Sequence, residues 1–281
     1  MKEYNFYLFD IDRTLWDFEK NAEHAIGSIF DDYDLPSVIS ADKKEFFHKY
    51  EEYNNKLWRL LDKDEITKEK LKESRYFLTL EYFFLHKHAK GAYDASMSDI
   101  LAALRTLSDK ALYGKFPRLE MLKGLAVEID AEYMERMKTE SALIPGARYL
   151  LEELKSCGKK TAVVSNGFKE AQYFKLKNSG IIDLVDSITV SEEAGCKKPN
   201  PDIFARALEK LCGKESFEKN EDAIKRSSLM AGDDYINDIK GAGDYGIDQF
   251  YFDPEGKAEG KSTYRSGCLC DILDFQNRHC S

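Results

Sequence analysis

Two aspartates separated by a single residue are the first candidates for chemistry in this sequence. Asp10 and Asp12 follow residues 5–9, which are apolar from Phe6 onward and predict a short strand. Residues two apart in extended backbone point to the same side, so we expect both carboxylates to face one site. One could attack a substrate covalently, while the other protonates the leaving oxygen and later activates water. Aspartates are also common in the turn after a strand, and this pair alone does not separate the two interpretations.

Ser165 and Asn166 indicate a phosphate-binding turn. They follow a second predicted strand, residues 161–164, and precede a predicted helix. A hydroxyl group and backbone N–H groups therefore converge where a phosphate oxygen could lie. Ser165 could also cap the helix, and the two roles are compatible.

Lys198 is a candidate for a phosphate contact through its point charge. It lies in segment 197–201, between a short predicted strand and the start of a helix, and two prolines stiffen this loop. Lysines in a run are usually solvated, which is our interpretation of Lys197.

A second group of acids, Asp233, Asp234 and Asp238, follows the predicted strand 229–231. The carboxyl ends of parallel strands meet at one edge of a sheet, so these carboxylates should join the first pair. Clustered carboxylates repel one another, and a hard divalent cation such as Mg²⁺ removes that cost. The alternative is a loop with a helix N-cap, which is the commoner arrangement for such a segment taken alone.

The elements that position these residues begin at residue 142, where short apolar runs alternate with amphipathic stretches. This pattern predicts βα units that form a parallel sheet. The predicted strands are residues 161–164, 188–190, 229–231 and 249–252, and the predicted helices are residues 147–156, about 170–178, 201–213 and from about 237. The charged segment 214–226 is predicted to be a solvated loop, and residues 254–281 give no clear prediction.

Residues 15–141 show helical periodicity alone, and we interpret their aromatic side chains as core. The sequence therefore predicts an α/β protein. Its Rossmann-like parallel sheet is interrupted after the first strand by an inserted all-helical domain. We expect the insertion to form a cap over the carboxyl ends of the strands, where ligands of open α/β sheets bind.

The composition narrows the class of partner. Acidic residues outnumber basic ones by 51 to 42, which disfavours nucleic-acid and anionic-membrane partners but allows a small phosphorylated metabolite. The first apolar run is too short for a signal peptide or a membrane span. The 6 cysteines form no zinc-type pair, so we expect reduced thiols and a cytoplasmic location. No oligomeric state is predicted.

The four chemical segments follow four separate predicted strands in order, and in this the chain resembles the haloacid dehalogenase (HAD) superfamily. Residues 10–15 match its first motif, Ser165 the second, Lys198 the third and residues 232–238 the fourth. The long insertion between the first two motifs resembles the branch with a helical cap. This implies a HAD-like core of residues 1–15 and 142–281 and a cap of residues 16–141.

A narrower resemblance lies in residues 15–19, 165–170 and 191–195, which are similar to pyrimidine 5′-nucleotidases described as house-cleaning enzymes. The chain departs from that pattern by extra length around residues 86–140 and after residue 254, which affects the inference about substrate. The resemblance implies a Mg²⁺-dependent phosphatase of small phosphomonoesters, with nucleoside 5′-monophosphates as the expected substrates.

The resemblance also implies roles for individual residues. Asp10 would be the nucleophile that becomes an aspartyl phosphate, and Asp12 the acid and base. The Asp10 carboxylate, the Asp12 carbonyl and the Asp233 carboxylate would ligate Mg²⁺. Asp238 would orient a metal-bound water, and Asp234 would be a helix cap or an auxiliary group.

The phosphoryl oxygens would be held by four groups. These are Thr14, Ser165, the Asn166 backbone and Lys198.

Three alternatives are weighed against this hypothesis. Dehalogenases of the superfamily lack the second aspartate of the first motif, because their leaving group needs no proton, so Asp12 argues against that activity. A sugar-phosphate phosphatase or phosphomutase remains open. A catalytically silent member that binds a partner through its enlarged cap is disfavoured by the intact motifs.

Overall fold

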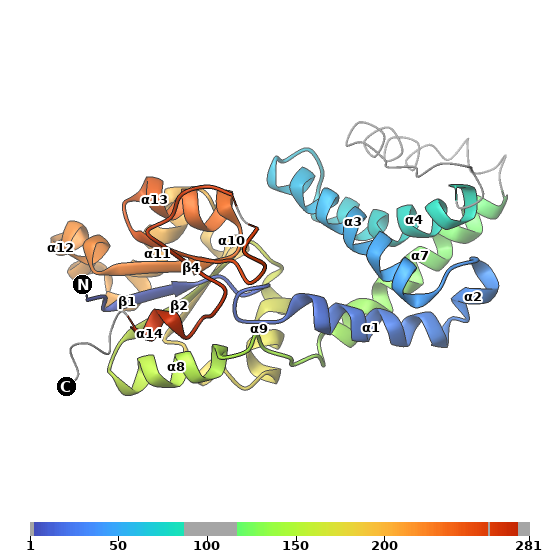
Figure 1. The fold of residues 1–281 in the computed structure, drawn as a ribbon. Coiled ribbons are helices and arrows are strands. Elements are labelled where there is room, and N and C mark those ends of the chain that lie inside the picture. Colours follow the sequence, from blue (N-terminus) through green and yellow to red (C-terminus); the bar gives the residue numbers. More distant parts are fainter. Residues whose placement is uncertain (1–2, 87–116, 258, 275–281) are drawn as a thin grey trace. The chain divides into compact units, whose positions relative to one another are not determined.

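The computed structural model describes residues 3–86, 117–257 and 259–274. The chain divides into two compact units (Figure 1). Unit 1 comprises Met1–Asn21 and Lys138–Ser281, and unit 2 comprises Ala22–Met137. The predicted boundaries, 15/16 and 141/142, lie a few residues from these divisions.

Unit 1 is built on a six-stranded sheet with the order β3-β2-β1-β4-β5-β6, in which every pairing is parallel. This confirms the predicted α/β class. Phe9 at the end of the central strand lies opposite Val163 on one side and Ala231 on the other. The segments that follow these three strands therefore leave the sheet at one edge. The strands are β1 Phe6–Phe9, β2 Lys160–Ser165, β3 Ser187–Val190, β4 Ser228–Gly232, β5 Asp248–Phe252 and β6 Tyr264–Ser266.

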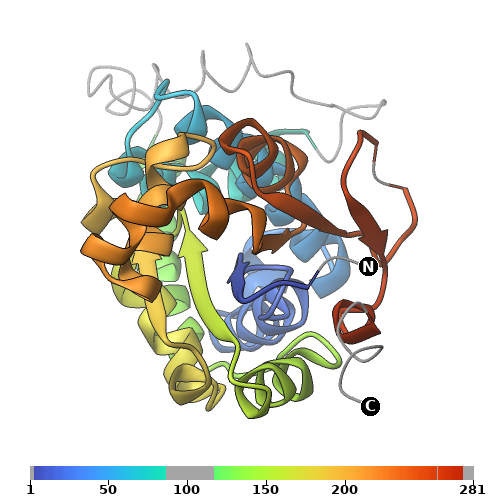
Figure 2. The ribbon, with the colours of Figure 1, turned by 90° about the vertical axis from the view of Figure 1, so that its left-hand side faces the viewer.

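Helices lie on both sides of this sheet (Figure 2). On one side, Leu8, Ala162 and Met230 from the three central strands form a buried cluster with Ile203 and Phe204. All four residues of β1 are apolar or aromatic, as expected for a strand that is covered on both faces. The helices of the unit are α8 Ala147–Ser156, α9 Lys169–Asn178, η2 Ile182–Leu184, α10 Ser191–Ala194, α11 Pro201–Cys212, α12 Lys214–Arg226, η3 Tyr235–Lys240, α13 Gly241–Tyr245 and α14 Asp271–Asp274.

The prediction of a solvated loop at residues 214–226 is wrong, because this segment is helix α12. The helix is kinked at Asn220, and Phe217 before the kink and Ile224 after it are both buried in the same cluster as Phe204. The remaining positions are mostly charged, so two apolar residues in thirteen gave too weak a periodicity to recognise. The predicted helix from about residue 237 begins slightly earlier, as the π-helix η3.

All regular structure is helical in the part of unit 2 that the structure describes. Asp42 caps α3 through a capping box with Glu45, and Thr67 caps α4. The elements are α1 Phe18–Asp32, which begins in unit 1, α2 Leu35–Val38, α3 Lys43–Asp62, α4 Lys68–Glu81, η1 Tyr82–His86 and α7 Pro117–Met137. Much of the extra length noted around residues 86–140 lies outside the described residues, as do positions 275–281. The expectation that the insertion covers the carboxyl ends stays a prediction.

Asn21 joins the two ends of the insertion within unit 1. Its side-chain amide donates to the carbonyl of Ala142 at 2.9 Å, and its side-chain oxygen accepts from the Ala142 N–H at 2.9 Å. Asn21 is buried, so this pair of hydrogen bonds is shielded from water. The chain therefore leaves and re-enters unit 1 at points fixed to one another.

The described part of the chain has no helix both long enough and apolar enough to cross a membrane. Its five cysteines are free thiols. The sixth, Cys280, lies outside the described residues, and the cytoplasmic location stays a prediction.

A buried ion pair organises the core of unit 2. Arg75 on α4 donates through Nε to Asp130 on α7 at 2.5 Å, and the Arg75 residue is only 4% exposed. Three buried tyrosines surround the pair, with the Arg75 guanidinium 4.8 Å from the Tyr133 ring centroid and the rings of Tyr50 and Tyr76 stacked at 4.9 Å. An ion in this position is stable only while its partner is present.

We expect Asp130→Ala to lower the free energy of unfolding of unit 2 by about 3–5 kcal/mol, because it leaves the Arg75 charge buried without its carboxylate. Urea denaturation followed by circular dichroism measures the change. Asp32→Ala, which removes an exposed carboxylate paired with Arg136, is the control and should cost less than about 1 kcal/mol. Equal losses in the two variants would contradict the role given to the buried pair.

Candidate active site

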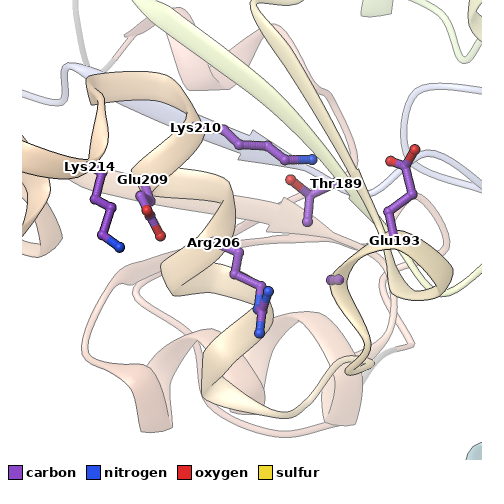
Figure 3. A pocket seen from close by; sticks show the side chains of 7 residues that line it. Thr189, Glu193, Arg206, Glu209, Lys210 and Lys214 are labelled. Carbon is purple, nitrogen blue, oxygen red and sulfur yellow. The ribbon is translucent and has the colours of Figure 1, made fainter.

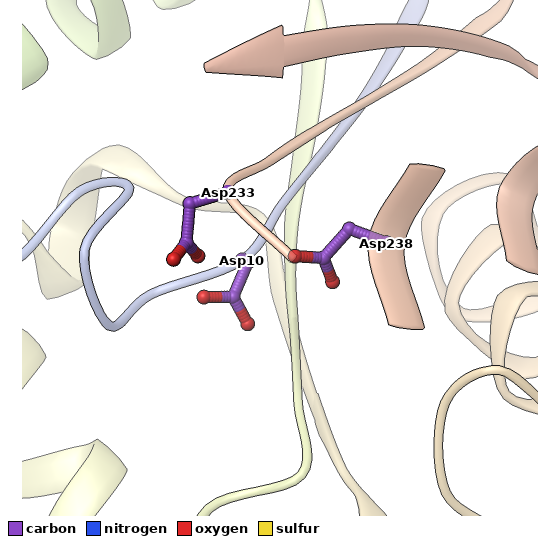
Figure 4. Close-up of side chains that lie close together, drawn as sticks. All are labelled: Asp10, Asp233 and Asp238. Carbon is purple, nitrogen blue, oxygen red and sulfur yellow. The ribbon is translucent and has the colours of Figure 1, made fainter. Parts of the chain in front are cut away.

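Three aspartates from two separate sequence regions meet at the carboxyl edge of the sheet. Asp10 follows β1, Asp233 follows β4, and Asp238 lies in η3 (Figure 4). One carboxylate oxygen from each lies within 4.8 Å of the other two. Asp10 continues the ladder beyond β1 by donating its N–H to Ala231 O at 2.9 Å, which fixes its position against β4. The structure thus brings together acids that are more than two hundred residues apart in the sequence.

Lys198 lies between two of these acids. Its Nζ donates to Asp10 Oδ1 at 2.5 Å and to Asp238 Oδ1 at 2.6 Å, and the residue is 3% exposed. Burial alone would lower the pKa of Lys198, but the two carboxylates outweigh it and raise that pKa above its usual value. The side chain is therefore a permanent positive charge at the centre of the site.

One ammonium does not balance three carboxylates, of which those of Asp10 and Asp238 are buried and that of Asp233 is partly buried. Burial raises the pKa of Asp10 to about 7, against the opposing effect of Lys198. Burial likewise raises the pKa values of Asp233 and Asp238, and neighbouring carboxylates raise them further. Hard oxygen donors with excess negative charge at this spacing suit a divalent cation such as Mg²⁺.

The loop after β4 is shaped around Asp238. A Cβ atom at Gly232 would lie 2.5 Å from the Asp238 Cβ, so only glycine leaves room for this side chain. The Asp234 N–H donates to Asp238 Oδ2 at 3.1 Å. Asp234 itself caps η3 by accepting from the N–H groups of Ile236 and Asn237 at 2.9 and 2.8 Å. Of the two roles predicted for Asp234, the structure therefore shows the helix cap.

Asn166 connects the second and third motifs. Its side chain donates to Lys198 O at 2.9 Å and accepts from Lys198 N–H at 2.8 Å, which holds the backbone of the lysine loop. The Lys198–Pro199 peptide bond is cis, and Pro199 packs so closely on Gly241 that a Cβ there would lie 2.8 Å from the Pro199 Cβ. The position of the Lys198 ammonium is thus determined from both sides of its loop.

The other predicted phosphate ligands lie near this loop. The hydroxyl of Ser165 accepts from the Gly167 N–H at 3.0 Å. Helix α9 begins at Lys169 after the N-cap residue Phe168 and has no side-chain cap, so the helix-capping role considered for Ser165 is wrong. The fully buried hydroxyl of Thr14 donates to Asp233 Oδ1 at 3.4 Å, so it contacts the acid cluster.

Asp12 has two partners that the sequence analysis missed. Lys175 Nζ donates to Asp12 Oδ1 at 2.5 Å, and Gln172 Nε2 donates to Asp12 Oδ2 at 2.9 Å. Burial would raise the pKa of Asp12, but Lys175 and Gln172 outweigh burial and lower it. Gln172 and Lys175 share one face of α9 at the i, i+3 spacing, which was the only sequence signal available.

A groove elsewhere in unit 1 shares no residue with this site. It lies between β3, α10 and α11 and presents side chains of both charge signs (Figure 3). Lys210, one of its basic residues, donates to Ile188 O at 2.8 Å. The residues that line the groove are Thr189, Glu193, Ala194, Arg206, Glu209, Lys210 and Lys214. The acid cluster is therefore the stronger candidate for a catalytic centre.

Comparison with known proteins agrees with this geometry. A family model described as haloacid dehalogenase-like hydrolase matches residues 4–246. The chain belongs to this family. Two relatives match most of this hydrolase. The putative HAD-hydrolase YfnB of Bacillus subtilis is 25% identical, and the match covers 92% of this chain and 87% of the relative. The pyrimidine 5′-nucleotidase PynA of Streptococcus pneumoniae is 22% identical, and the match covers 98% of this chain and 96% of the relative. These names support a phosphoric monoester hydrolase.

Solved structures show the same fold. The hydrolase superimposes on a structure of YfnB bound to magnesium with a TM-score of 0.70 at 22% identity, covering 98% of this chain and 100% of the other. It also superimposes on L-2-haloacid dehalogenase from Xanthobacter autotrophicus, with a TM-score of 0.60 at 14% identity and 99% and 100% covered. The same fold thus occurs in enzymes with different names. The residues of the site, and not the fold, have to indicate which reaction this chain catalyses.

We expect Gly232→Ala to lower the free energy of unfolding by about 1–3 kcal/mol, because the new methyl group displaces Asp238 from Lys198 in a closely packed site. Gly27→Ala is the matched control: Gly27 lies within α1 with no atom within 4 Å of its Cβ position. That change should raise stability by up to about 1 kcal/mol. Thermal and urea denaturation of both variants test the pair, and a stable Gly232→Ala protein would contradict the packing argument.

Proposed function

We propose that this hydrolase is a Mg²⁺-dependent phosphatase that transfers phosphate from a small phosphomonoester to Asp10 and then to water. The observation that carries the proposal is the meeting of Asp10, Asp233 and Asp238 around the Lys198 ammonium, with Asp12 two residues beyond Asp10. This arrangement offers a nucleophile, a separate acid and base, and groups that neutralise phosphate charge.

Asp10 and Asp12 divide the chemistry between them. A carboxylate oxygen of Asp10 attacks phosphorus, and the bond to the leaving oxygen breaks while Asp12 supplies the proton that oxygen needs. In the second step Asp12 takes a proton from water, whose oxygen attacks phosphorus and releases Asp10 and inorganic phosphate. Lys198 orients the Asp10 carboxylate through their hydrogen bond.

The acid cluster fits Mg²⁺, because it offers hard oxygen donors whose charge exceeds that of Lys198. The Asp10 and Asp233 carboxylates and the Asp12 carbonyl would hold the ion, with Asp238 beside them, bonded to Lys198 and to the Asp234 N–H. When bound, Mg²⁺ supplies charge neutralisation at the transferring phosphoryl group. The magnesium in the related YfnB structure supports this choice.

Thr14, Ser165, the Asn166 backbone and Lys198 would hold the phosphoryl oxygens. A loose phosphoryl-transfer transition state needs mainly positioning and neutralisation of charge, and these groups provide both.

Nucleoside 5′-monophosphates are the proposed substrates. The similarity to the pyrimidine 5′-nucleotidase PynA supports this choice of substrate. So does the similarity to the pyrimidine 5′-nucleotidase YjjG of Escherichia coli, which is 31% identical over 120 residues that cover 43% of this chain and 49% of the relative. A sugar-phosphate substrate is the second candidate, because the ribulose-1,5-bisphosphate 5-phosphatase of Halopiger xanaduensis is 32% identical over 140 residues, half of this chain and 54% of the relative. Asp12 and its ligands on α9 argue against dehalogenation, in which the leaving group needs no proton.

We expect Asp10→Asn to abolish the covalent phosphoenzyme, because an amide is a far poorer nucleophile than a carboxylate. Acid quenching after incubation with substrate carrying labelled phosphate measures the protein-bound label. Asp244→Asn, which alters an exposed aspartate paired with Lys240, should retain full labelling. Label that persists on the Asp10 variant would show that another group is the nucleophile.

In Asp12→Asn, we expect turnover to fall by about 100-fold to 10,000-fold while substrate affinity changes little, because only proton transfer is lost. Steady-state kinetics and equilibrium binding separate the two effects. Unchanged turnover would remove the acid and base assignment.

Release of inorganic phosphate should require Mg²⁺ and should be fastest with pyrimidine nucleoside 5′-monophosphates. A panel of those substrates with purine monophosphates, sugar phosphates and phosphoglycolate, assayed with Mg²⁺ or with excess chelator, tests both points. Phosphorus NMR of the products distinguishes release from transfer to a sugar. Equal rates without Mg²⁺ would overturn the metal proposal, and indifference to pyrimidine monophosphates would overturn the substrate proposal alone.

A further inference from the structure

The side chain of Asp12 is held at both of its oxygens by one helix. Lys175 Nζ lies 2.5 Å from Oδ1 and Gln172 Nε2 lies 2.9 Å from Oδ2, and both donors come from α9. The two residues are buried, at 7% and 1% exposed. A carboxylate bound at both oxygens cannot rotate about its last torsion without losing both hydrogen bonds.

Aromatic rings lie beside the Lys175 ammonium. Its Nζ lies 4.6 Å from the centroid of the Trp16 ring and 6.0 Å from that of Phe18. Its side chain is 9% exposed, whereas that of Asp12 is 27% exposed. Asp12 is therefore the more exposed member of the pair.

Gln172 owes its position to Gly167 in the turn after β2. A Cβ atom at Gly167 would lie 2.7 Å from the Gln172 Cδ, so a larger residue would push the amide away from Asp12. The Gln172 backbone N–H bonds to Phe168 O at 3.0 Å, in the first turn of α9. The turn that presents Ser165 thus also places the helix that holds Asp12.

We propose that Lys175 and Gln172 are positioning residues that hold the Asp12 carboxylate in the orientation from which it protonates the leaving oxygen. This inference rests on the proposed function, in which Asp12 is the acid. Without these two hydrogen bonds the Asp12 carboxyl group could rotate to other orientations. A displacement of about 1 Å in a catalytic group can cost about 100-fold in rate.

The leaving group reveals whether a residue acts through Asp12. An alkyl phosphate such as uridine 5′-monophosphate or glycerol 2-phosphate expels a strongly basic alkoxide that needs a proton, whereas 4-nitrophenyl phosphate expels a weakly basic phenolate that does not. The ratio kcat/KM reports the steps through departure of the leaving group, so the slower attack by water does not obscure it.

In Lys175→Met we expect kcat/KM for the alkyl phosphates to fall by about 30-fold to 100-fold, and that for the aryl phosphate by less than about threefold. Lys175→Arg should recover part of the loss. Lys177→Met, at an exposed position on the same helix, is the matched control and should match the parent enzyme. Adding Lys175→Met to Asp12→Asn should cause little further loss, because both changes remove the same step.

Equal losses on both kinds of substrate, or full additivity with Asp12→Asn, would overturn the positioning role and leave Lys175 as a structural residue. Asp12→Asn assayed alone separates the two proposals. If the loss in Asp12→Asn is the same for alkyl and aryl phosphates, the acid assignment itself fails. If the loss in Asp12→Asn depends on the leaving group but the loss in Lys175→Met does not, only the positioning role fails. Should Lys175→Met not fold, Gln172→Met keeps the side-chain length but removes the donor, and it should show the same dependence on a smaller scale.

Discussion

The central constraint on this structure is the gathering of three carboxylates, those of Asp10 and Asp238 buried and that of Asp233 partly buried, around one ammonium. Lys198 donates hydrogen bonds to Asp10 and Asp238. Asp233 is the third acid of the cluster, and Lys198 is the one cation among these four residues. Burial makes each unneutralised charge costly, so the surrounding backbone has to hold the acids together against their mutual repulsion. A site of this kind is stable enough to form, yet it retains the negative charge that attracts a divalent cation.

The parallel sheet supplies most of the restraint that holds the acids together. Strands β1, β2 and β4 are parallel neighbours that end at the same edge of the sheet, so the residues that follow them lie close together. The loops are then fixed to one another: Asn166 holds the lysine loop, and Gly232 admits Asp238. Helix α9 links two parts of the site, because it follows the turn after β2 that contains Ser165 and its side chains also hold Asp12.

Residues adjacent to strand ends could be predicted from the sequence, because a strand, its polarity and the residue that follows it are local properties. Asp10, Ser165 and Asp233 were predicted in this way, together with the parallel sheet. Lys198 was predicted from the proline-containing loop before a helix, and α10 separates it from the end of β3. The partners of Asp12 could not be found, since a lysine and a glutamine on an amphipathic helix carry no mark of a contact some 160 residues away. Helix α12 was missed for a related reason: its buried face holds too few apolar residues to stand out from its charges.

Asn21 and its two hydrogen bonds to Ala142 have a consequence for how such proteins diversify. These hydrogen bonds hold the two ends of the insertion together within unit 1. The length and sequence of the inserted segment can therefore change while the sheet and the loops after its strands keep their geometry.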